Sequence, residues 1–358
     1  MKVLHVTTHL NVGGIPTYIY NVSKYLVRNG IEVAVASSGG NWEGEFKKIG
    51  VKTFTIDIKT KSELSPKILY SLFDLKSIKK DFDFDLLHSH TRVTQILCSL
   101  YSKFYKTPHI ANFHGFYEKN KLRLSRRLIK AQGKFSIAIT PQTGEELVKH
   151  FGADPSKVKV ILSSIDFERL NTSSLPLSLE GTPKIGASGR LSPVKGFNYL
   201  ISAMPQIIKD FPNAHLYLCG EGSEQKRLLH LAQELNISDK VKIIQKVPIA
   251  DFLRALDVFC LPSIEEPLGL SVIEAQYFGI PPIVSDAGGL TILVENEKTG
   301  LVTPKADSAA IAAAVKKILT DKELKNRISI NCKQQALDKF DLSKKINEFI
   351  AVYNEALK

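Results

Sequence analysis

Residues 260–289 read CLPSIEEPLGLSVIEAQYFGIPPIVSDAGG and pass from a short apolar run through a loop into a helical pattern and a second apolar run. The loop carries Glu266, and Glu274 follows about one turn into the expected helix. The first amides of a helix have no acceptor within it, and the helix dipole favours an anion at that end. The stretch therefore predicts a strand–loop–helix–strand unit in which two carboxylates, able to accept hydrogen bonds from sugar or ribose hydroxyls, flank an anion site. The amides expected at this site belong to Gly269, Leu270 and Ser271.

The same alternation of apolar runs and amphipathic stretches continues outward to both ends of the chain. In the second half, strands are expected at 184–188, 214–219, 240–245, 257–261, 281–285 and 300–303. In the first half they are expected at 2–7, 31–37, 51–56, 85–89, 108–113, 135–140 and 157–162, with helices at 15–29, 66–80, 92–105, 120–133 and 141–151. The strands are rich in Val and Ile without clear alternation, as in sheets covered on both faces. The pattern predicts an α/β fold with two doubly wound, Rossmann-like parallel sheets.

The length of 358 residues exceeds one typical core and predicts two domains. Residues 167–183, FERLNTSSLPLSLEGTP, carry no convincing period and are expected to form the linker. The expected domains are residues 1–168 and 169–340, facing across a cleft, followed by a final helix at 341–358. Ligands of doubly wound sheets bind beyond the carboxyl ends of the strands, so candidate residues are sought just after each strand.

Two segments of the first half place candidate residues in such positions. Gly13-Gly14 precedes an expected helix, where glycines let the backbone approach a ligand and the helix start offers free amides. The dinucleotide fingerprint G-x-G-x-x-G is absent from this loop. His114 ends an expected strand, and its imidazole can donate a hydrogen bond to a sugar hydroxyl or a developing charge. An ordinary turn and a structural histidine are the alternative interpretations.

The second half opens with a strand that runs into Gly189-Arg190, and Lys195-Gly196 begins the next helix. Two cations five positions apart around a glycine-bearing loop suit a diphosphate, because the Arg fork and the compact Lys charge both bind phosphate oxygens. The Walker pattern G-x-x-x-x-G-K-[ST] is absent from this loop. A solvated basic loop is the alternative.

These segments together resemble the retaining glycosyltransferases of the GT-B type, in particular glycosyltransferase family 4. Glu266 and Glu274 match the two glutamates of the family's E-x7-E motif. Five further segments match the family in order and spacing, namely Gly13-Gly14, His114-Gly115, Gly189-Arg190-Leu191 with Lys195-Gly196, Gly220-Glu221-Gly222 and Thr299-Gly300. The resemblance implies an N-terminal acceptor-binding domain, a C-terminal donor-binding domain, and a last helix that crosses back onto the first domain.

Roles for individual residues follow from this resemblance. Glu266 is expected to bind hydroxyls of the transferred sugar, and Glu274 the ribose of the nucleotide. Arg190 and Lys195 are expected to neutralise the diphosphate leaving group as a metal does in other enzymes, so neither a metal nor a cofactor is expected. Catalytic roles are implied for His114, Arg190, Lys195 and Glu266. The other donor-binding residues implied are Gly13, Gly14, Gly189, Glu221, Gly269, Leu270, Ser271 and Glu274.

The resemblance also implies retention of the anomeric configuration, by attack on the same face as the departing phosphate and without a protein nucleophile. Two positions depart from the family pattern. Ser163-Ser164 stands before Asp166 where the family often has Asn-Gly, and Ile292 stands three residues after Gly288-Gly289 where the family usually has a glutamate. Neither change falls on a position expected to bind the diphosphate or the ribose. Both changes therefore affect what can be expected of the donor sugar and of the local geometry.

The net charge of +12 lies almost entirely in the first 170 residues, which hold 26 Lys and Arg against 15 Asp and Glu. Such a field attracts an anionic partner. Within it, residues 119–134 hold seven Lys or Arg and no acid, with leucines interleaved, as suits a helix at an anionic membrane or an anionic acceptor. Leucines facing the core and cations facing water are the alternative. The expected contacts are Lys119, Lys121, Arg123, Arg126, Arg127 and Lys130.

Several other classes fit the composition poorly. No apolar run approaches the roughly 20 residues that span a bilayer, and no signal peptide is recognisable, so we expect a cytoplasmic protein that is peripheral on the inner membrane face. Four scattered cysteines form no C-x-x-C pair. The D-x-D of residues 81–85 is interpreted as a strand entry, and His88 and His90 with His114 make only a weak zinc pattern. No aromatic-studded nucleic-acid module accompanies the charge.

The expected activity is transfer of a sugar from a nucleotide sugar to a saccharide or lipid-linked acceptor, in cell-surface polysaccharide or glycolipid assembly. A UDP-sugar is favoured because it is the family's commonest donor. A nucleotide-sugar epimerase of GT-B fold and a non-catalytic protein that binds nucleotide sugars or glycans stay open as alternatives. An NAD-dependent enzyme fits less well because the dinucleotide fingerprint is missing. Product analysis and turnover separate these readings.

Overall fold

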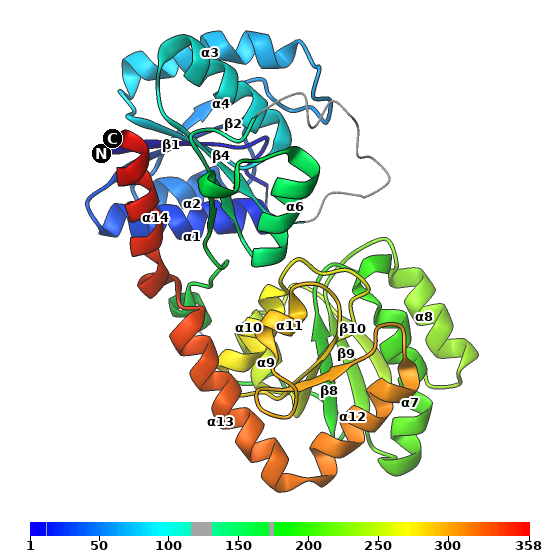
Figure 1. Cartoon of the computed structure of the whole chain (residues 1–358). Coiled ribbons are helices and arrows are strands. Elements are labelled where there is room, and N and C mark those ends of the chain that lie inside the picture. The colour runs from blue at the N-terminus through cyan, green and yellow to red at the C-terminus, as the bar shows by residue number, and fades with distance from the viewer. Residues whose placement is uncertain (12, 116–130, 172–174) are drawn as a thin grey trace. The chain divides into compact units, whose positions relative to one another are not determined.

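The computed structural model describes residues 1–11, 13–115, 131–171 and 175–358 (Figure 1). It divides into two compact units. Unit 1 comprises Met1–Ser163 together with Leu342–Lys358, and unit 2 comprises Ser164–Asp341. Each unit is built on one parallel sheet flanked by helices, so the predicted α/β architecture with two Rossmann-like units is confirmed.

Unit 1 contains a seven-stranded parallel sheet in the order β3-β2-β1-β4-β5-β6-β7. Its strands are β1 (Lys2–Val6), β2 (Glu32–Ser37), β3 (Lys52–Thr55), β4 (Leu86–Ser89), β5 (His109–Phe113), β6 (Phe135–Ala138) and β7 (Val158–Val160). The chain runs outward from β1 to β3 and then crosses back to β4, so the strand order reverses between β1 and β4. Ligands of doubly wound sheets bind at such a reversal, which here lies at the residues that follow these two strands.

Two apolar cores cover the faces of this sheet. Because successive strand residues point to opposite faces, Val3 joins the core under α1, α2 and α14, whereas Leu4 and Val6 join the core under α3 and α4. The helices are α1 (Gly14–Arg28), α2 (Glu43–Lys48), α3 (Lys67–Asp81), α4 (Arg92–Tyr105), α6 (Pro141–Phe151) and α14 (Leu342–Leu357). Phe349 and Tyr353 of α14 are fully buried in the first core, so the expected return of the last helix to the first unit is confirmed.

Unit 2 contains a six-stranded parallel sheet in the order β10-β9-β8-β11-β12-β13. Its strands are β8 (Lys184–Ser188), β9 (His215–Cys219), β10 (Val241–Ile244), β11 (Val258–Leu261), β12 (Pro282–Ser285) and β13 (Leu301–Thr303). Its helices are α7 (Phe197–Asp210), α8 (Gln225–Glu234), α9 (Ile249–Arg254), α10 (Leu270–Tyr277), α11 (Leu290–Leu293), α12 (Ser308–Thr320) and α13 (Lys322–Lys339). Here the strand order reverses between β8 and β11.

The start of unit 2 differs from the expected domain boundary. A 3₁₀-helix, η3 (Phe167–Leu170), lies in unit 2, although these residues were expected to belong to the linker. The ring of Phe167 stacks on Tyr277 with centroids 4.4 Å apart, and the Ile165 amide donates to the Phe340 carbonyl at 2.9 Å. Phe167 and Leu170 of η3 are therefore buried, although the composition of residues 167–183 resembles that of a linker.

Every expected strand is present, with ends that differ by at most two residues. The short helix α2 was not expected, and the helix expected at 120–133 lies mostly outside the described residues. In the D-x-D segment, Phe82 and Phe84 are buried, and the carboxylate of Asp85 accepts from the Lys2 amide at 2.7 Å. This segment is thus held by apolar packing and by a backbone contact next to β1.

Candidate functional site

The reversal of strand order in unit 2 brings together the loops that follow β8 and β11. Lys195 Nζ, from the first loop, donates to Oε2 of Glu266, from the second, at 2.5 Å. The same oxygen accepts from Ser263 Oγ at 3.0 Å, and the Ile264 amide donates to the Val194 carbonyl at 2.8 Å. A buried carboxylate requires a partner of this kind. The cation and carboxylate expected to bind adjoining parts of one donor therefore lie in direct contact.

The loop after β8 is also fixed against the loop after β9. The Gly189 amide donates to the Cys219 carbonyl at 3.0 Å, and the Leu191 amide donates to the Glu221 carbonyl at 2.8 Å. Gly220 has φ of +155°, and a Cβ at this position would lie 1.9 Å from the Gly189 carbonyl oxygen, so only glycine fits. This backbone contact places Arg190 and Glu221, which are both exposed, at the same end of the sheet, after β8 and β9.

The N-terminus of α10 follows Glu266 directly. Gly269 occupies the N-cap position with φ of +96°, and no side chain caps the helix. A Cβ on Gly269 would lie 2.6 Å from Leu290 Cδ2 and 3.5 Å from Glu266 Cγ. Leu270 and Ser271 occupy the first turn, where backbone amides have no acceptor within the helix. The anion site expected at these three residues thus adjoins the Lys195–Glu266 pair.

Glu274, further along α10, is buried and forms an ion pair with Arg169 of η3. Burial raises the pKa of Glu274, and the Arg169 guanidinium partly offsets the rise. Burial also raises the pKa of the Cys219 thiol to about 11, with a further contribution from the charge of Glu274. Sequence reasoning missed Arg169, because a lone Arg in a polar segment carries no local signal of its distant partner.

In unit 1, the expected residues lie after β1 and after β5, the strand beside β4, and so near the other reversal of strand order. Gly13 caps α1, Gly14 begins it, and a Cβ added at Gly14 would meet no atom within 4 Å. His114 follows β5 and is partly buried, with its Nε2 3.2 Å from His90 Nδ1 and 3.2 Å from Asn112 Nδ2. The Tyr18 ring packs edge-on against the His114 ring, with centroids 4.7 Å apart.

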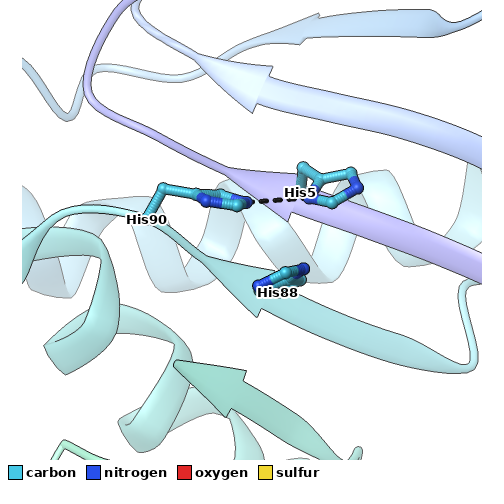
Figure 2. Close-up of side chains that lie close together, drawn as sticks. All are labelled: His5, His88 and His90. Carbon is cyan, nitrogen blue, oxygen red and sulfur yellow. Dashed lines mark hydrogen bonds between the residues drawn. The ribbon is translucent and has the colours of Figure 1, made fainter. Parts of the chain in front are cut away.

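His90, which contacts His114, belongs to a histidine cluster with His5 and His88 (Figure 2), and the sequence alone did not reveal that His5 joins it. His5 Nδ1 lies 2.8 Å from His90 Nε2, and His88 Nδ1 lies 2.7 Å from the Tyr353 hydroxyl. His5 and His88 are register partners on β1 and β4, which explains their proximity. The sequence does contain a signal for this pair. Each of the two apolar strands, KVLHV and LLHS, has one histidine near its end.

Burial dominates the electrostatics of these histidines. It lowers the pKa of His5 and of His114 to about 3, and it lowers the pKa of His90 well below its usual value, with smaller contributions from the neighbouring histidines. The imidazoles are therefore neutral near pH 7 and act as hydrogen-bond partners rather than as cations. His114 can thus offer a neutral imidazole at the edge of the sheet.

The basic contacts expected at an acceptor or membrane fall on residues 116–130, outside the described part of the chain. Those contacts, from Lys119 to Lys130, stay predictions. Over the described ranges, the structure contains no helix with the length and apolar character needed to cross a membrane.

Comparison with known families finds two models that together match most of the chain. The model described as Glycosyltransferase Family 4 matches residues 12–169, and the model described as Glycosyl transferases group 1 matches residues 175–335. The chain belongs to the family 4 glycosyltransferases. The predicted family is therefore confirmed, and with it the predicted class of enzyme, a transferase.

Relatives and solved structures agree with this membership. One relative, from Escherichia coli, is the UDP-Gal:alpha-D-GlcNAc-diphosphoundecaprenol alpha-1,3-galactosyltransferase. The chain is 27% identical to it over 80% of the chain and 79% of the relative. It is 25% identical to the D-inositol 3-phosphate glycosyltransferase of Corynebacterium glutamicum, over 96% of the chain and 92% of the relative. Its structure resembles Anabaena HepE in complex with UDP and glucose, with a TM-score of 0.84, 21% identity and coverage of 99% and 100%. The GT-B fold is thereby confirmed.

Proposed function

We propose that this glycosyltransferase transfers a sugar from a UDP-sugar to a saccharide or lipid-linked acceptor, with retention of anomeric configuration and without a metal in the donor site. The observation that carries the proposal is the contact between Lys195 and Glu266 beside the N-terminus of α10. A cation, a carboxylate and uncapped helix amides within one site suit a ligand that presents both phosphate oxygens and sugar hydroxyls.

Each of these groups has a distinct task in the proposed reaction. Lys195 and the exposed Arg190 neutralise the charge that develops on the departing diphosphate, with help from the amides of the first turn of α10. Glu266 exchanges its contact with Lys195 for hydroxyls of the donor sugar, and Glu274 accepts hydrogen bonds from the ribose. In unit 1, His114 and the Gly13-Gly14 loop contact substrate, and no protein nucleophile takes part.

The choice of donor and acceptor rests on the relatives. The Escherichia coli relative is described as acting with UDP-Gal on a diphosphoundecaprenol-linked sugar, and HepE was solved with UDP and glucose. The Corynebacterium relative is described as acting on inositol 3-phosphate. All three descriptions name UDP or an anionic acceptor, in keeping with a basic N-terminal half. They support a UDP-sugar donor and an anionic or lipid-linked acceptor, and the proposal assigns the reaction to the assembly of a cell-surface polysaccharide or glycolipid.

Product analysis tests this proposal. The full chain is incubated with a UDP-sugar and a diphosphate-linked saccharide acceptor, and the anomeric proton of the product is followed by NMR. We expect a new glycosidic bond with the anomeric configuration of the donor, and no such bond with the Glu266→Ala variant. An inverted product would contradict retention. Conversion of the UDP-sugar into its epimer without an acceptor would show instead the epimerase alternative.

We also propose that unit 1 contacts an anionic membrane from the cytoplasmic side, through the exposed face of α3 and the end of α4. Leu69 and Phe73 of α3 are 58% and 71% exposed, and Phe104 of α4 is 65% exposed. Lys76 of α3 lies 5.9 Å from the ring of Tyr105 on α4, so a cation of the first helix lies beside an exposed aromatic ring at the end of the second. Further exposed cations are Lys80 of α3, Lys103 of α4 and Lys106 directly after α4.

Large apolar side chains among lysines suit the boundary between acyl chains and anionic headgroups. Sedimentation with vesicles checks this contact. The protein should sediment with phosphatidylglycerol vesicles more than with phosphatidylcholine vesicles, and Phe73→Ser should weaken the binding. Ile330→Ser is the matched control, because Ile330 is 69% exposed on α13 of unit 2. Equal loss in both variants, or no preference for the anionic lipid, would overturn the assignment.

A further inference from the structure

Three histidines of unit 1 have the spacing of a metal site. The ring centroids of His5, His88 and His90 lie 4.3 to 5.0 Å apart, and one nitrogen of each lies within 4.8 Å of the others. Figure 2 shows the three rings gathered beside β1 and β4, with the contact between His5 and His90 drawn as a dashed line. Throughout the described ranges, this is the one group of three histidine, cysteine or acidic side chains that could hold an ion.

The hydrogen bonds of this cluster are incomplete. His88 Nδ1 lies 2.7 Å from the Tyr353 hydroxyl, and the Asn112 side chain also interacts with this ring, while the buried Nε2 meets no hydrogen-bond partner of normal geometry. His5 contacts His90 through Nδ1, and its Nε2 is likewise buried without a partner. Both residues are fully buried. Buried polar atoms are nearly always satisfied, so the unpartnered Nε2 of His88, beside the contact of His5 with His90, calls for a ligand.

We propose that His5, His88 and His90 bind a divalent transition-metal ion of the Zn²⁺ class. Imidazole nitrogens suit Zn²⁺, Ni²⁺ and Cu²⁺ better than Mg²⁺ or Ca²⁺. Zn–N bonds of about 2.0–2.1 Å in a tetrahedron separate the ligand nitrogens by about 3.4 Å. That spacing lies between the 2.8 Å contact of His5 with His90 and the 4.8 Å limit of the cluster, so the rings must shift to a common spacing to bind the ion.

The surroundings supply the orienting contacts that metal ligands need. A histidine that binds a metal through one nitrogen usually holds a hydrogen-bond partner on the other. The Tyr353 hydroxyl occupies this position for His88, and His114, 3.2 Å from Nδ1, occupies it for His90. Three protein ligands leave a tetrahedral ion one position for water or another small ligand. Because Tyr353 belongs to α14, the ion would also connect the last helix to β1 and β4.

This site is built only from residues of unit 1, whereas the phosphate-binding groups proposed above belong to unit 2. Metal binding at these histidines is therefore independent of the donor chemistry. Binding can be measured with the metal alone, in the absence of any substrate.

Titration of the full chain with Co²⁺ and Zn²⁺ tests the proposal. After treatment with a chelator and desalting, Co²⁺ should give the visible absorption of a tetrahedral complex, and one equivalent of Zn²⁺ per chain should abolish it. His88→Gln and His90→Gln should each weaken Zn²⁺ binding at least about tenfold. The matched control is His109→Gln, because His109 is equally buried but contacts Ser89 Oγ and lies outside the cluster.

Thermal unfolding of each variant without metal shows whether it folds. If a histidine variant does not fold, Tyr353→Phe replaces it, since it removes only the hydroxyl that orients His88 and should weaken Zn²⁺ binding about tenfold. Absence of the Co²⁺ absorption from the wild-type chain would overturn the proposal. Equal Zn²⁺ affinity in the wild-type chain and in the folded cluster variants would overturn it as well.

Discussion

At the scale of single residues, both glutamates of the proposed donor site have a cationic partner within unit 2. Glu266 is paired with Lys195 and Glu274 with Arg169. Removing one partner from a buried pair leaves an uncompensated charge, which is more destabilising than the pair itself is stabilising. A donor that supplies phosphate to Lys195 and hydroxyls to Glu266 satisfies both groups at once. The pair is therefore poised for exchange with a ligand of mixed charge and polarity.

Replacement of Lys195 tests this reading directly. Lys195→Ala should lower turnover by about 10²–10³-fold, the usual effect of losing one group that stabilises developing charge. The Ser263 hydroxyl still donates to Glu266, so the fold should survive, as thermal unfolding can check. Lys209→Ala, at an exposed position of α7, is the matched control and should leave turnover unchanged. Turnover near that of the wild type in Lys195→Ala would remove Lys195 from the site.

Gly14 offers a second residue-scale prediction. A Cβ at Gly14 would meet no protein atom within 4 Å, and alanine favours helix by up to about 1 kcal/mol over glycine. Gly14→Ala should therefore keep or raise the unfolding temperature while lowering turnover about tenfold or more, if substrate approaches this backbone. Gly44→Ala in α2 is the control, because its Cβ is equally unopposed. Full activity in Gly14→Ala would show that the double glycine serves only the turn.

At the scale of elements, the sheet of unit 1 holds its histidines by register. His109 begins β5, is fully buried, and has its Nε2 2.7 Å from Ser89 Oγ of β4. Burial lowers the pKa of His109 from 6.5 to about 3. The unfolded chain therefore binds a proton at His109 below about pH 6.5 that the folded chain does not bind. The contribution of His109 to the free energy of unfolding is thus fully present above this pH and is lost as the pH falls.

The size of this effect can be measured on a variant. Between about pH 7.5 and about pH 5.5, the wild-type chain should lose about 1.4 kcal/mol of unfolding free energy relative to His109→Gln. Urea unfolding of both proteins at the two pH values gives the difference. Glutamine cannot titrate but can keep the contact with Ser89. An identical pH dependence of the two proteins would mean that His109 is protonated in the folded sheet.

The elements also show how far the sequence alone could lead. Strands were predicted to within two residues because continuous Val and Ile runs mark parallel strands covered on both faces. The short helix α2, Glu43–Lys48, was missed because a single polar turn has no usable period. The Arg169–Glu274 pair and the His5–His88 contact were missed for another reason. Each depends on how distant segments meet, and the local sequence does not record that.

At the scale of the whole molecule, the proposed chemistry divides by charge and by unit. The first 170 residues carry almost all of the net charge of +12, and the donor-site residues Lys195, Glu266 and Glu274 lie in unit 2. If Lys195 and Arg190 replace a metal at the diphosphate, turnover should persist in excess EDTA. A loss restored by Mg²⁺ or Mn²⁺ would contradict the metal-free donor site, whereas a loss restored only by Zn²⁺ would point to the histidine cluster.

Donor binding to the whole chain tests the proposed nucleotide-sugar site of unit 2. The measurement is a thermal-shift screen of the purified protein against UDP-, GDP- and ADP-sugars, with the wild-type chain beside Arg190→Ala. A ligand at about 100 times its Kd stabilises the folded state by about 2.7 kcal/mol, enough for a clear rise in Tm. We predict such a rise with a UDP-sugar and a smaller one in Arg190→Ala. No shift with any nucleotide sugar, or an equal shift in both proteins, would contradict the donor site described for unit 2.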